Sequence, residues 1–258
     1  MPQLAGLHAV VTGASSGIGR AIALEFAAAG AQLSLHARSS AQALQQVAGE
    51  AGGAATHLAD LGQHGAGAEL VASVWDRSPI DIWVHNAGAD VLTGDAAAID
   101  FGAKLDLLWQ VDVRGTIETC RAVGERMRER GRGVILTIGW DQAEVGMEGD
   151  PGEMFGTTKG AVMAFTKALA KSLAPSVRVN CLAPGWIKTK WGDDAPDYWR
   201  ERAQREALVG RWGEPADVAA AACYLASPAA SFVTGCVLPV NGGFSGALPR
   251  AASDSAGG

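Results

Sequence analysis

Tyrosine is scarce in this 258-residue sequence, which has two tyrosines beside eight tryptophans and six phenylalanines. The two tyrosines are Tyr198 and Tyr224. Because tyrosine is the only side chain with a phenolic proton, chemistry that needs such a group is restricted to these two positions.

Cysteine is also scarce. The four residues stand far apart, without a C-x-x-C pair or a histidine at metal-ligand spacing: Cys120, Cys181, Cys223 and Cys236. This pattern argues against a disulfide framework and against a zinc site. We therefore expect reduced, buried thiols in a cytoplasmic protein, and no bound metal.

Basic clusters and long apolar runs are lacking too. The 21 basic and 27 acidic side chains give a net charge of -6, with no block of Lys or Arg. This balance argues against nucleic acid or an anionic membrane as a partner. No stretch approaches the ~20 apolar residues of a spanning helix, and the N-terminus has no basic segment before an apolar one. We expect a soluble, cytoplasmic protein with a small-molecule substrate.

What the sequence contains is an alternation of short apolar or β-branched runs with longer helical patterns. It predicts one α/β domain, a doubly wound (Rossmann) parallel sheet of seven strands with helices on both faces. The predicted strands are 7–12, 32–37, 54–59, 81–85, 133–138, 178–183 and 237–240. The predicted helices are 17–29, 41–51, 66–78, 99–130, 152–173, 194–207 and 215–226. Residues 1–245 form the predicted domain, with a lid at about 186–212 and a flexible tail at 246–258.

A glycine-rich turn follows the first predicted strand directly. It reads Thr12-Gly13-Ala14-Ser15-Ser16-Gly17-Ile18-Gly19 and leads into a predicted helix. Glycines let the backbone turn tightly and approach a pyrophosphate, whose charge is met by N–H groups at the helix N-terminus. The turn therefore predicts a dinucleotide site at the start of the chain.

This turn resembles that of the short-chain dehydrogenase/reductase family, whose glycine pattern is T-G-x-x-x-G-x-G. Six further segments resemble the family in order and spacing, namely Asp60-Leu61, Asn86-Ala87-Gly88, Arg178-Val179-Asn180, Pro184-Gly185-Trp186-Ile187-Lys188-Thr189, Arg211-Trp212-Gly213-Glu214-Pro215 and Asn241-Gly242-Gly243. In the last segment the family more often has aspartate before the paired glycines. The resemblance spans roughly residues 5–245.

The resemblance implies a nicotinamide-dependent oxidoreductase, often a homotetramer or dimer. The cofactor-binding residues that it implies are Gly13, Ser15, Ser16, Gly17, Ile18, Gly19, Arg38, Ser39, Asp60, Leu61, Asn86, Ala87, Gly88, Lys159, Pro184, Gly185, Ile187 and Thr189. In this family the residue at the end of the second strand chooses the cofactor. Here it is Arg38, followed by two serines, and a cation favours the 2′-phosphate of NADP(H) over the ribose hydroxyls of NAD.

The catalytic pattern departs from the family. Its members carry Y-x-x-x-K, and Lys159 matches the lysine, but Phe155 stands where the tyrosine belongs. The paired serines map onto Gly139-Trp140 followed by Asp141, and either Trp140 or Asp141 is a candidate for the serine position. An ordinary ketoreductase mechanism needs a hydroxyl to protonate the developing alkoxide, so we expect a different chemistry.

The candidate catalytic residues are Lys159, Asp141 and Asp112, the last at the position of the family's helix asparagine. The expected substrate pocket comprises Trp140, Met154, Phe155, Trp186, Trp191 and Tyr198. A carboxylate stabilises a cationic C=N group, so an imine, iminium or pterin-like substrate is favoured. The four acids of the following loop, Glu144, Glu148, Asp150 and Glu153, would make the entrance to the site acidic and attract a cationic substrate. Two alternatives stay open: a lyase, isomerase or cyclase on this scaffold, or a nonenzymatic NADP-binding protein.

Overall fold

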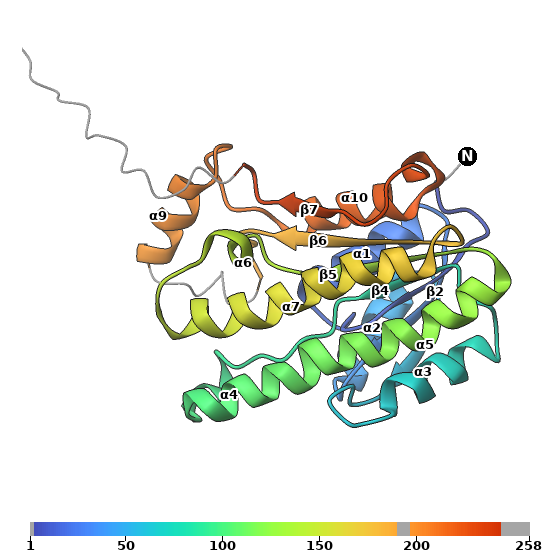
Figure 1. Ribbon diagram of the computed structural model, residues 1–258, viewed down its shortest axis with the longest axis horizontal. Helices are drawn as coiled ribbons and strands as arrows, with labels where there is room; N and C mark the ends of the chain where they lie inside the picture. Colours follow the sequence, from blue (N-terminus) through green and yellow to red (C-terminus); the bar gives the residue numbers. More distant parts are fainter. Residues whose placement is uncertain (1–2, 190–196, 244–258) are drawn as a thin grey trace, which may run out of the picture.

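A seven-stranded parallel sheet forms the centre of the computed structural model, which describes residues 3–189 and 197–243 (Figure 1). The strand order is β3-β2-β1-β4-β5-β6-β7. The strands are β1 (His8–Val11), β2 (Gln32–Ala37), β3 (Ala55–Leu58), β4 (Ile82–His85), β5 (Gly133–Ile138), β6 (Val177–Pro184) and β7 (Val237–Val240). The prediction of seven parallel strands is confirmed. The order reverses between β1 and β4, which is where ligands bind in doubly wound folds.

Helices cover both faces of the sheet (Figure 1). One face is covered by α1 (Gly17–Ala28), α2 (Ala41–Glu50) and α10 (Pro215–Ala226), whose apolar side chains form one buried cluster with the strands. The other face is covered by α3 (Ala66–Trp75), α5 (Gly115–Arg130) and α7 (Gly149–Leu173), which share a second buried cluster. Strand β1 is buried along its whole length, as expected of a strand covered on both sides.

The helix predicted over 99–130 is divided in the structure. A short 3-10 helix, η1 (Gly94–Ala98), precedes α4 (Phe101–Leu108), and a π-helical turn, η2 (Trp109–Arg114), separates α4 from α5. Asp100 caps α4 by accepting a hydrogen bond from the backbone N–H of Ala103, so the helix begins after Ile99. A π turn carries one extra residue per turn and often marks a functional site. Here it contains Asp112, which is 2% exposed.

Other differences lie near the mouth of the fold. A single-turn helix, α6 (Gln142–Val145), was not expected, and α7 begins three residues before its predicted start. The predicted helix 194–207 corresponds to α9 (Asp197–Glu206). A short 3-10 helix, η3 (Pro228–Ala230), follows α10. Residues 190–196, which include Trp191, and the tail at 246–258 lie outside the described residues.

The structure also bears on thiols and membrane insertion. All four cysteines are unpaired, and three of them are buried while Cys236 is half-buried. No helix within residues 3–189 and 197–243 combines the length and apolarity needed to cross a bilayer.

Candidate active site

The glycine turn is shaped by close backbone contacts. Gly13 and Gly17 have positive φ angles of 64° and 54°. A Cβ atom on Gly19 would lie 2.2 Å from the carbonyl oxygen of Gly13 and 2.5 Å from Nδ2 of Asn86. No side chain fits there, so the start of α1 packs directly on the turn and presents its N–H groups at the sheet edge.

Two polar side chains fix this turn to the neighbouring strand. The Thr12 hydroxyl oxygen accepts hydrogen bonds from the backbone N–H groups of Asn86 and Ala87, both at 3.0 Å. The Asn86 side chain donates to the carbonyl oxygens of Thr12 and Gly13 at 3.2 and 3.1 Å. Residues after β1 and after β4 are therefore held as one unit at the point where the strand order reverses.

A cleft of about 390 Å³ opens beside this unit. Ten of the predicted cofactor residues line it: Gly13, Ser15, Ser16, Arg38, Ser39, Asp60, Leu61, Asn86, Ala87 and Gly88. Seven lining residues were not predicted, namely His36, Ala37, Ser40, Ala59, Ala89, Asp90 and Val111. Most of these adjoin predicted ones in the chain, so adjacency was the signal that could have found them.

Eight predicted cofactor residues do not line the cleft: Gly17, Ile18, Gly19, Lys159, Pro184, Gly185, Ile187 and Thr189. One contact nevertheless joins the far segment to the glycine turn. A Cβ atom on Gly17 would lie 3.7 Å from Cγ2 of Thr189. The segment after β6 thus reaches the start of α1.

The outer end of the cleft is cationic and rich in hydroxyls. Arg38, Ser39 and Ser40 are exposed and follow β2. Behind them, His36 is 1% exposed and its Nε2 lies 2.9 Å from the carbonyl oxygen of Ala59. Burial lowers the pKa of His36, so this imidazole is neutral near pH 7 and adds no charge. Arg38 is thus the cation of the cleft lining.

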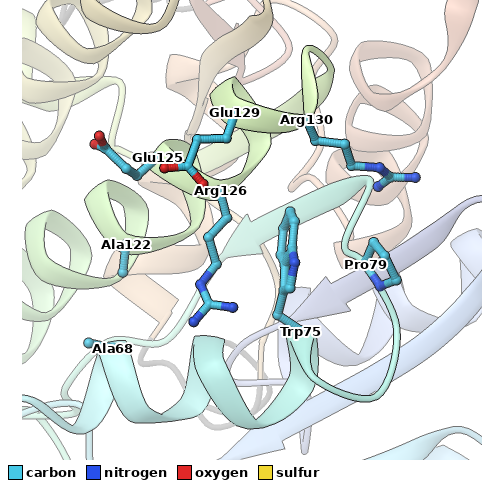
Figure 2. Close-up of a pocket in the computed structure, with 8 residues that line it drawn as sticks. All are labelled: Ala68, Trp75, Pro79, Ala122, Glu125, Arg126, Glu129 and Arg130. Atoms are coloured by element: carbon cyan, nitrogen blue, oxygen red, sulfur yellow. The ribbon is translucent and has the colours of Figure 1, made fainter.

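A larger hollow, of about 760 Å³, lies elsewhere, between α3 and α5. Figure 2 shows the indole of Trp75 standing between Arg126 and Pro79 in this hollow. The Arg126 guanidinium lies 5.8 Å from the Trp75 ring centroid and 3.8 Å from an Asp76 oxygen. No predicted site residue lines it, so the smaller cleft is the candidate site.

Lys159 and Asp112 meet at the inner end of the site. Nζ of Lys159, on α7, lies 2.8 Å from Oδ2 of Asp112, and their side chains are 16% and 2% exposed. The other carboxylate oxygen, Oδ1, accepts a hydrogen bond of 2.8 Å from the backbone N–H of Ala89. Both oxygens of Asp112 are therefore engaged, one by the lysine and one by the chain that follows β4.

Two aromatic rings, which the resemblance aligns with the serine and tyrosine positions of the family, pack against each other. Trp140 and Phe155 pack edge to face, with ring centroids 6.3 Å apart and an interplanar angle of 75°. Of the two candidates for the serine position, Trp140 thus has a ring contact with Phe155. Met154 is 2% exposed and lies in a buried cluster with Val91 and Leu108, so it packs behind Phe155.

Asp141 points toward the last two strands instead. Its backbone N–H donates to the carbonyl oxygen of Pro184 at 3.2 Å, and its Oδ2 accepts from Nδ2 of Asn241 at 3.1 Å. Oδ1 is buried and has no hydrogen-bond partner. Burial raises the pKa of Asp141 to about 6, and the negative charge of Glu206 adds to the rise while the Asn241 amide opposes it. No hydrogen bond or ion pair joins Asp141 to Lys159.

An ionic network that the sequence did not indicate, buried except at Glu148, holds the described part of the lid. Arg202 of α9 donates from Nε to Glu206 at 2.7 Å and from its two terminal nitrogens to Glu148 at 2.6 and 3.2 Å. Glu206 in turn accepts from the indole N–H of Trp186 at 2.7 Å. The side chains of Arg202 and Glu206 are 9% and 3% exposed, whereas that of Glu148 is 72% exposed.

Tryptophans surround this network. The rings of Trp186 and Trp199 lie 5.4 Å apart, and the Arg202 guanidinium lies 5.9 and 5.4 Å from their centroids. The i, i+4 spacing of Arg202 and Glu206 was visible in the sequence, but nothing in it indicated that the pair would be buried. We call these contacts of Glu148, Trp186, Arg202 and Glu206 the lid anchor. The indole N–H of Trp186 is thus already paired with Glu206.

Neither tyrosine lies at the position of Phe155. Tyr198 is 58% exposed on α9 and packs edge to face on Trp199, with centroids 5.0 Å apart. Tyr224 is 45% exposed on α10, which covers the opposite face of the sheet from α7. Position 155 itself therefore carries a phenyl ring, and the two phenols lie on α9 and α10.

The fold and the glycine turn define a doubly wound dinucleotide-binding protein. The sequence profile described as "Enoyl-(Acyl carrier protein) reductase" matches residues 13–245. Galactitol 2-dehydrogenase (L-tagatose-forming) of Cereibacter sphaeroides is 38% identical over 94% of this chain and 96% of its own. The 3-oxoacyl-[acyl-carrier-protein] reductase FabG of Thermotoga maritima is 33% identical over 93% and 98%.

Solved structures agree with these relatives. A 3-oxoacyl (acyl-carrier-protein) reductase from Agrobacterium tumefaciens with NADP bound superposes with a TM-score of 0.82 and 31% identity, over 93% of this chain and 95% of that one. A 3-ketoacyl-(acyl-carrier-protein) reductase from Brucella melitensis complexed with NADH gives 0.83 and 32%, over 93% and 98%. The chain belongs to the short-chain dehydrogenase/reductase family and is an oxidoreductase of that type.

Proposed function

We propose that this oxidoreductase uses NADP(H) and acts on a C=N bond, in an imine, iminium or pterin-like compound. The observation that carries the proposal is the pairing of two replacements. Phe155 and Trp140 fill the place of the hydroxyl groups, while Asp141 offers a buried carboxyl oxygen that has no partner. Compared with the family pattern, the proposed site would lack the phenolic proton donor and would offer a carboxyl group instead.

The choice of NADP(H) is supported by the outer end of the cleft. Arg38 with Ser39 and Ser40 offers a cation and two hydroxyls and no carboxylate, which suits a 2′-phosphate. One solved neighbour contains NADP and another contains NADH, so Arg38 of this chain is the deciding feature. The crowded contacts of Gly13 and Gly19 leave a side-chain-free turn that suits a pyrophosphate.

Lys159 would hold the nicotinamide ribose, and Asp112 would position Lys159 through their 2.8 Å contact. Asp112 is therefore a positioning residue in this proposal, because both of its oxygens are occupied by protein groups. When bound, the nicotinamide supplies a hydride to the substrate. Every proton that the reaction needs must come from this chain or from water.

Asp141 would supply charge or a proton to the substrate nitrogen. An iminium ion becomes a neutral amine when its carbon gains a hydride, so its nitrogen needs no proton from the protein. Before that step the Asp141 carboxylate would stabilise the cation by accepting an N–H hydrogen bond at Oδ1. A neutral imine does need a proton, and a carboxyl group with a pKa of about 6 can donate one near neutral pH.

The walls of the proposed substrate pocket are aromatic. Trp140 and Phe155 are half-buried beside Lys159, and Trp186 and Tyr198 lie at the lid. Flat apolar walls suit a planar substrate. Trp191, which completes the predicted set, lies outside the described residues.

We further propose that the protein is a homo-oligomer, a tetramer or dimer. Phe232, just after η3, is fully exposed, and Tyr224 of the adjacent α10 is 45% exposed. A second copy of the chain would cover these rings. Analytical ultracentrifugation of the wild type and of Phe232→Ser tests this, since a monomeric wild type contradicts it.

Arg38→Ala tests the cofactor. Loss of the cation should weaken NADPH binding by about 100-fold, a common size for a charge-assisted phosphate contact, and leave NADH binding nearly unchanged. Titration of the protein's fluorescence with each nucleotide measures both constants, with Arg77→Ala, in the exposed turn after α3, as the matched control. Equal losses for the two nucleotides would refute the assignment.

Asp141→Asn tests the chemistry. A panel that pairs cyclic imines, such as 1-pyrroline, with their cyclic ketone counterparts is assayed for oxidation of NADPH. We expect turnover of imines by the wild type and a fall in kcat of at least about 100-fold in the variant. Full imine turnover by the variant, or turnover of ketones alone by the wild type, would reject the carboxyl mechanism.

A further inference from the structure

We propose that Asn241, directly after β7, is a positioning residue that fixes the orientation of the Asp141 carboxyl group by holding Oδ2, which leaves Oδ1 without a protein partner. The inference rests on the proposed role of Asp141. Three strand ends bring the residues together, because the Asp141 N–H donates to Pro184 and the Gly185 N–H donates to Val240 at 3.1 Å. Asn241 is the residue that follows Val240, so it lies beside Asp141 although 100 positions separate them.

The orientation of the Asn241 amide is fixed by its own turn. Gly242 and Gly243 both have positive φ, 67° and 76°, and the turn brings the Gly243 N–H back to Oδ1 of Asn241 at 3.0 Å. An N–H group needs an acceptor, so the oxygen of the amide must face Gly243 and the nitrogen must face the other way. That nitrogen is the group that donates to Oδ2 of Asp141 at 3.1 Å.

The fit is tight enough to hold the carboxyl group in one orientation. Gly185 lies against both side chains, and a Cβ atom there would stand 2.6 Å from Cβ of Asn241 and 3.0 Å from Oδ2 of Asp141. With Oδ2 bound to Asn241, Oδ1 is left buried and without a partner. A buried acceptor without a partner is costly, and a donor on the substrate removes that cost.

Charge explains why the residue at 241 must be an amide. The groups that act on the Asp141 carboxyl are the Asn241 amide directly after β7, the backbone N–H groups of Gln142 and of Asp141 itself, and the carboxylate of Glu206 from α9. Glu206 already disfavours a second negative charge. An aspartate at 241 would place another carboxylate about 3 Å away with no donor between them. Asn241 is thus a neutral donor that favours the charged form of Asp141, whereas an aspartate at 241 would oppose it.

The experiment measures the titration of Asp141 itself in the full chain without nucleotide. Carbon-13 labelled aspartate gives one carboxyl resonance per residue, and the resonance that disappears in Asp141→Asn is assigned to Asp141. Asn241→Leu should raise its midpoint by about one pH unit, a tenfold change in acidity, since the donor to the charged form is lost. Asn241→Asp should raise it further, by about two units.

Controls separate this inference from the proposed function. Ser231→Asp adds the same charge at an exposed position after η3 and should leave the midpoint unchanged. An unchanged midpoint in both Asn241 variants overturns the inference, whatever the enzyme turns over. A shifted midpoint combined with full imine turnover by Asp141→Asn retains the orientation and rejects the function. If the Asn241 variants do not fold, Gly185→Ala, which pushes the pair apart, should raise the midpoint in the same way, and no shift overturns the inference.

Discussion

The nucleotide half of the molecule, from β1 to the end of α5, and the substrate half, from β5 onward, are shaped by different kinds of contact. In the first half the contacts that shape the site come mainly from backbone groups and a few small side chains, as at Gly13, Gly19 and Thr12. In the second half the site depends on large side chains that meet from distant positions, as Asp141 does with Asn241. Backbone geometry tolerates little change in sequence, whereas converging side chains can be exchanged together. Two positions at which we interpret the sequence as departing from the family pattern, Phe155 and Asn241, lie in this second half.

The strongest test of this comparison is Gly19→Ala in the nucleotide half. The added Cβ would stand 2.2 Å from a carbonyl oxygen, so the turn must open. We expect NADPH affinity to fall by at least about 100-fold, measured by calorimetric titration. Gly49→Ala, in α2 with nothing within 4 Å of the added atom, is the matched control and should bind normally. Unchanged affinity in Gly19→Ala would remove the steric account of the turn.

The Asp112–Lys159 pair joins the two halves, and its loss should have the next largest effect. Asp112→Ala leaves a mostly buried ammonium and the Ala89 N–H without their acceptor, which should lower the free energy of unfolding by about 3 kcal/mol. Asp112→Asn keeps an acceptor for Ala89 and should lose less. Urea denaturation measures both, with exposed Asp106→Ala on α4 as the control. If the three variants are equally stable, the pair does not join the halves.

The smallest effect concerns the pH dependence of the substrate half. Because the pKa of Asp141 is about 6 in the folded protein and about 3.8 unfolded, the folded state binds more protons between these values. Stability from this group is therefore full below about pH 4 and is lost as the pH rises through 6. Asp141→Asn should then stabilise the protein by about 2 kcal/mol at pH 8, after discounting for partial exposure, and by little at pH 4.

Thermal unfolding across this pH range measures the difference, and Glu144→Gln, an exposed acid in α6, provides the control. A gain for Asp141→Asn that is the same at pH 4 and pH 8 would show that Asp141 titrates normally.

The sequence predicted the architecture well because burial on both faces makes each parallel strand an apolar run, as in β1 and β4. It predicted the glycine turn because only glycine has the required backbone freedom. It did not predict the π turn at Trp109–Arg114, since the helical periodicity continues through it. It also missed the partners Arg202, Glu206 and Asn241, whose roles arise from contacts between segments far apart in the chain.

The lid anchor has one solvent-exposed contact and one buried contact. Glu148 is 72% exposed, so dissolved salt screens its attraction to Arg202, while the contact between Arg202 and Glu206 lies out of reach of ions. Rising ionic strength should therefore weaken the contact between Glu148 and Arg202 first and leave the hydrogen bond from Trp186 to Glu206 in place. Helix α9 is thus held to the rest of the protein by one contact that depends on salt and one that does not.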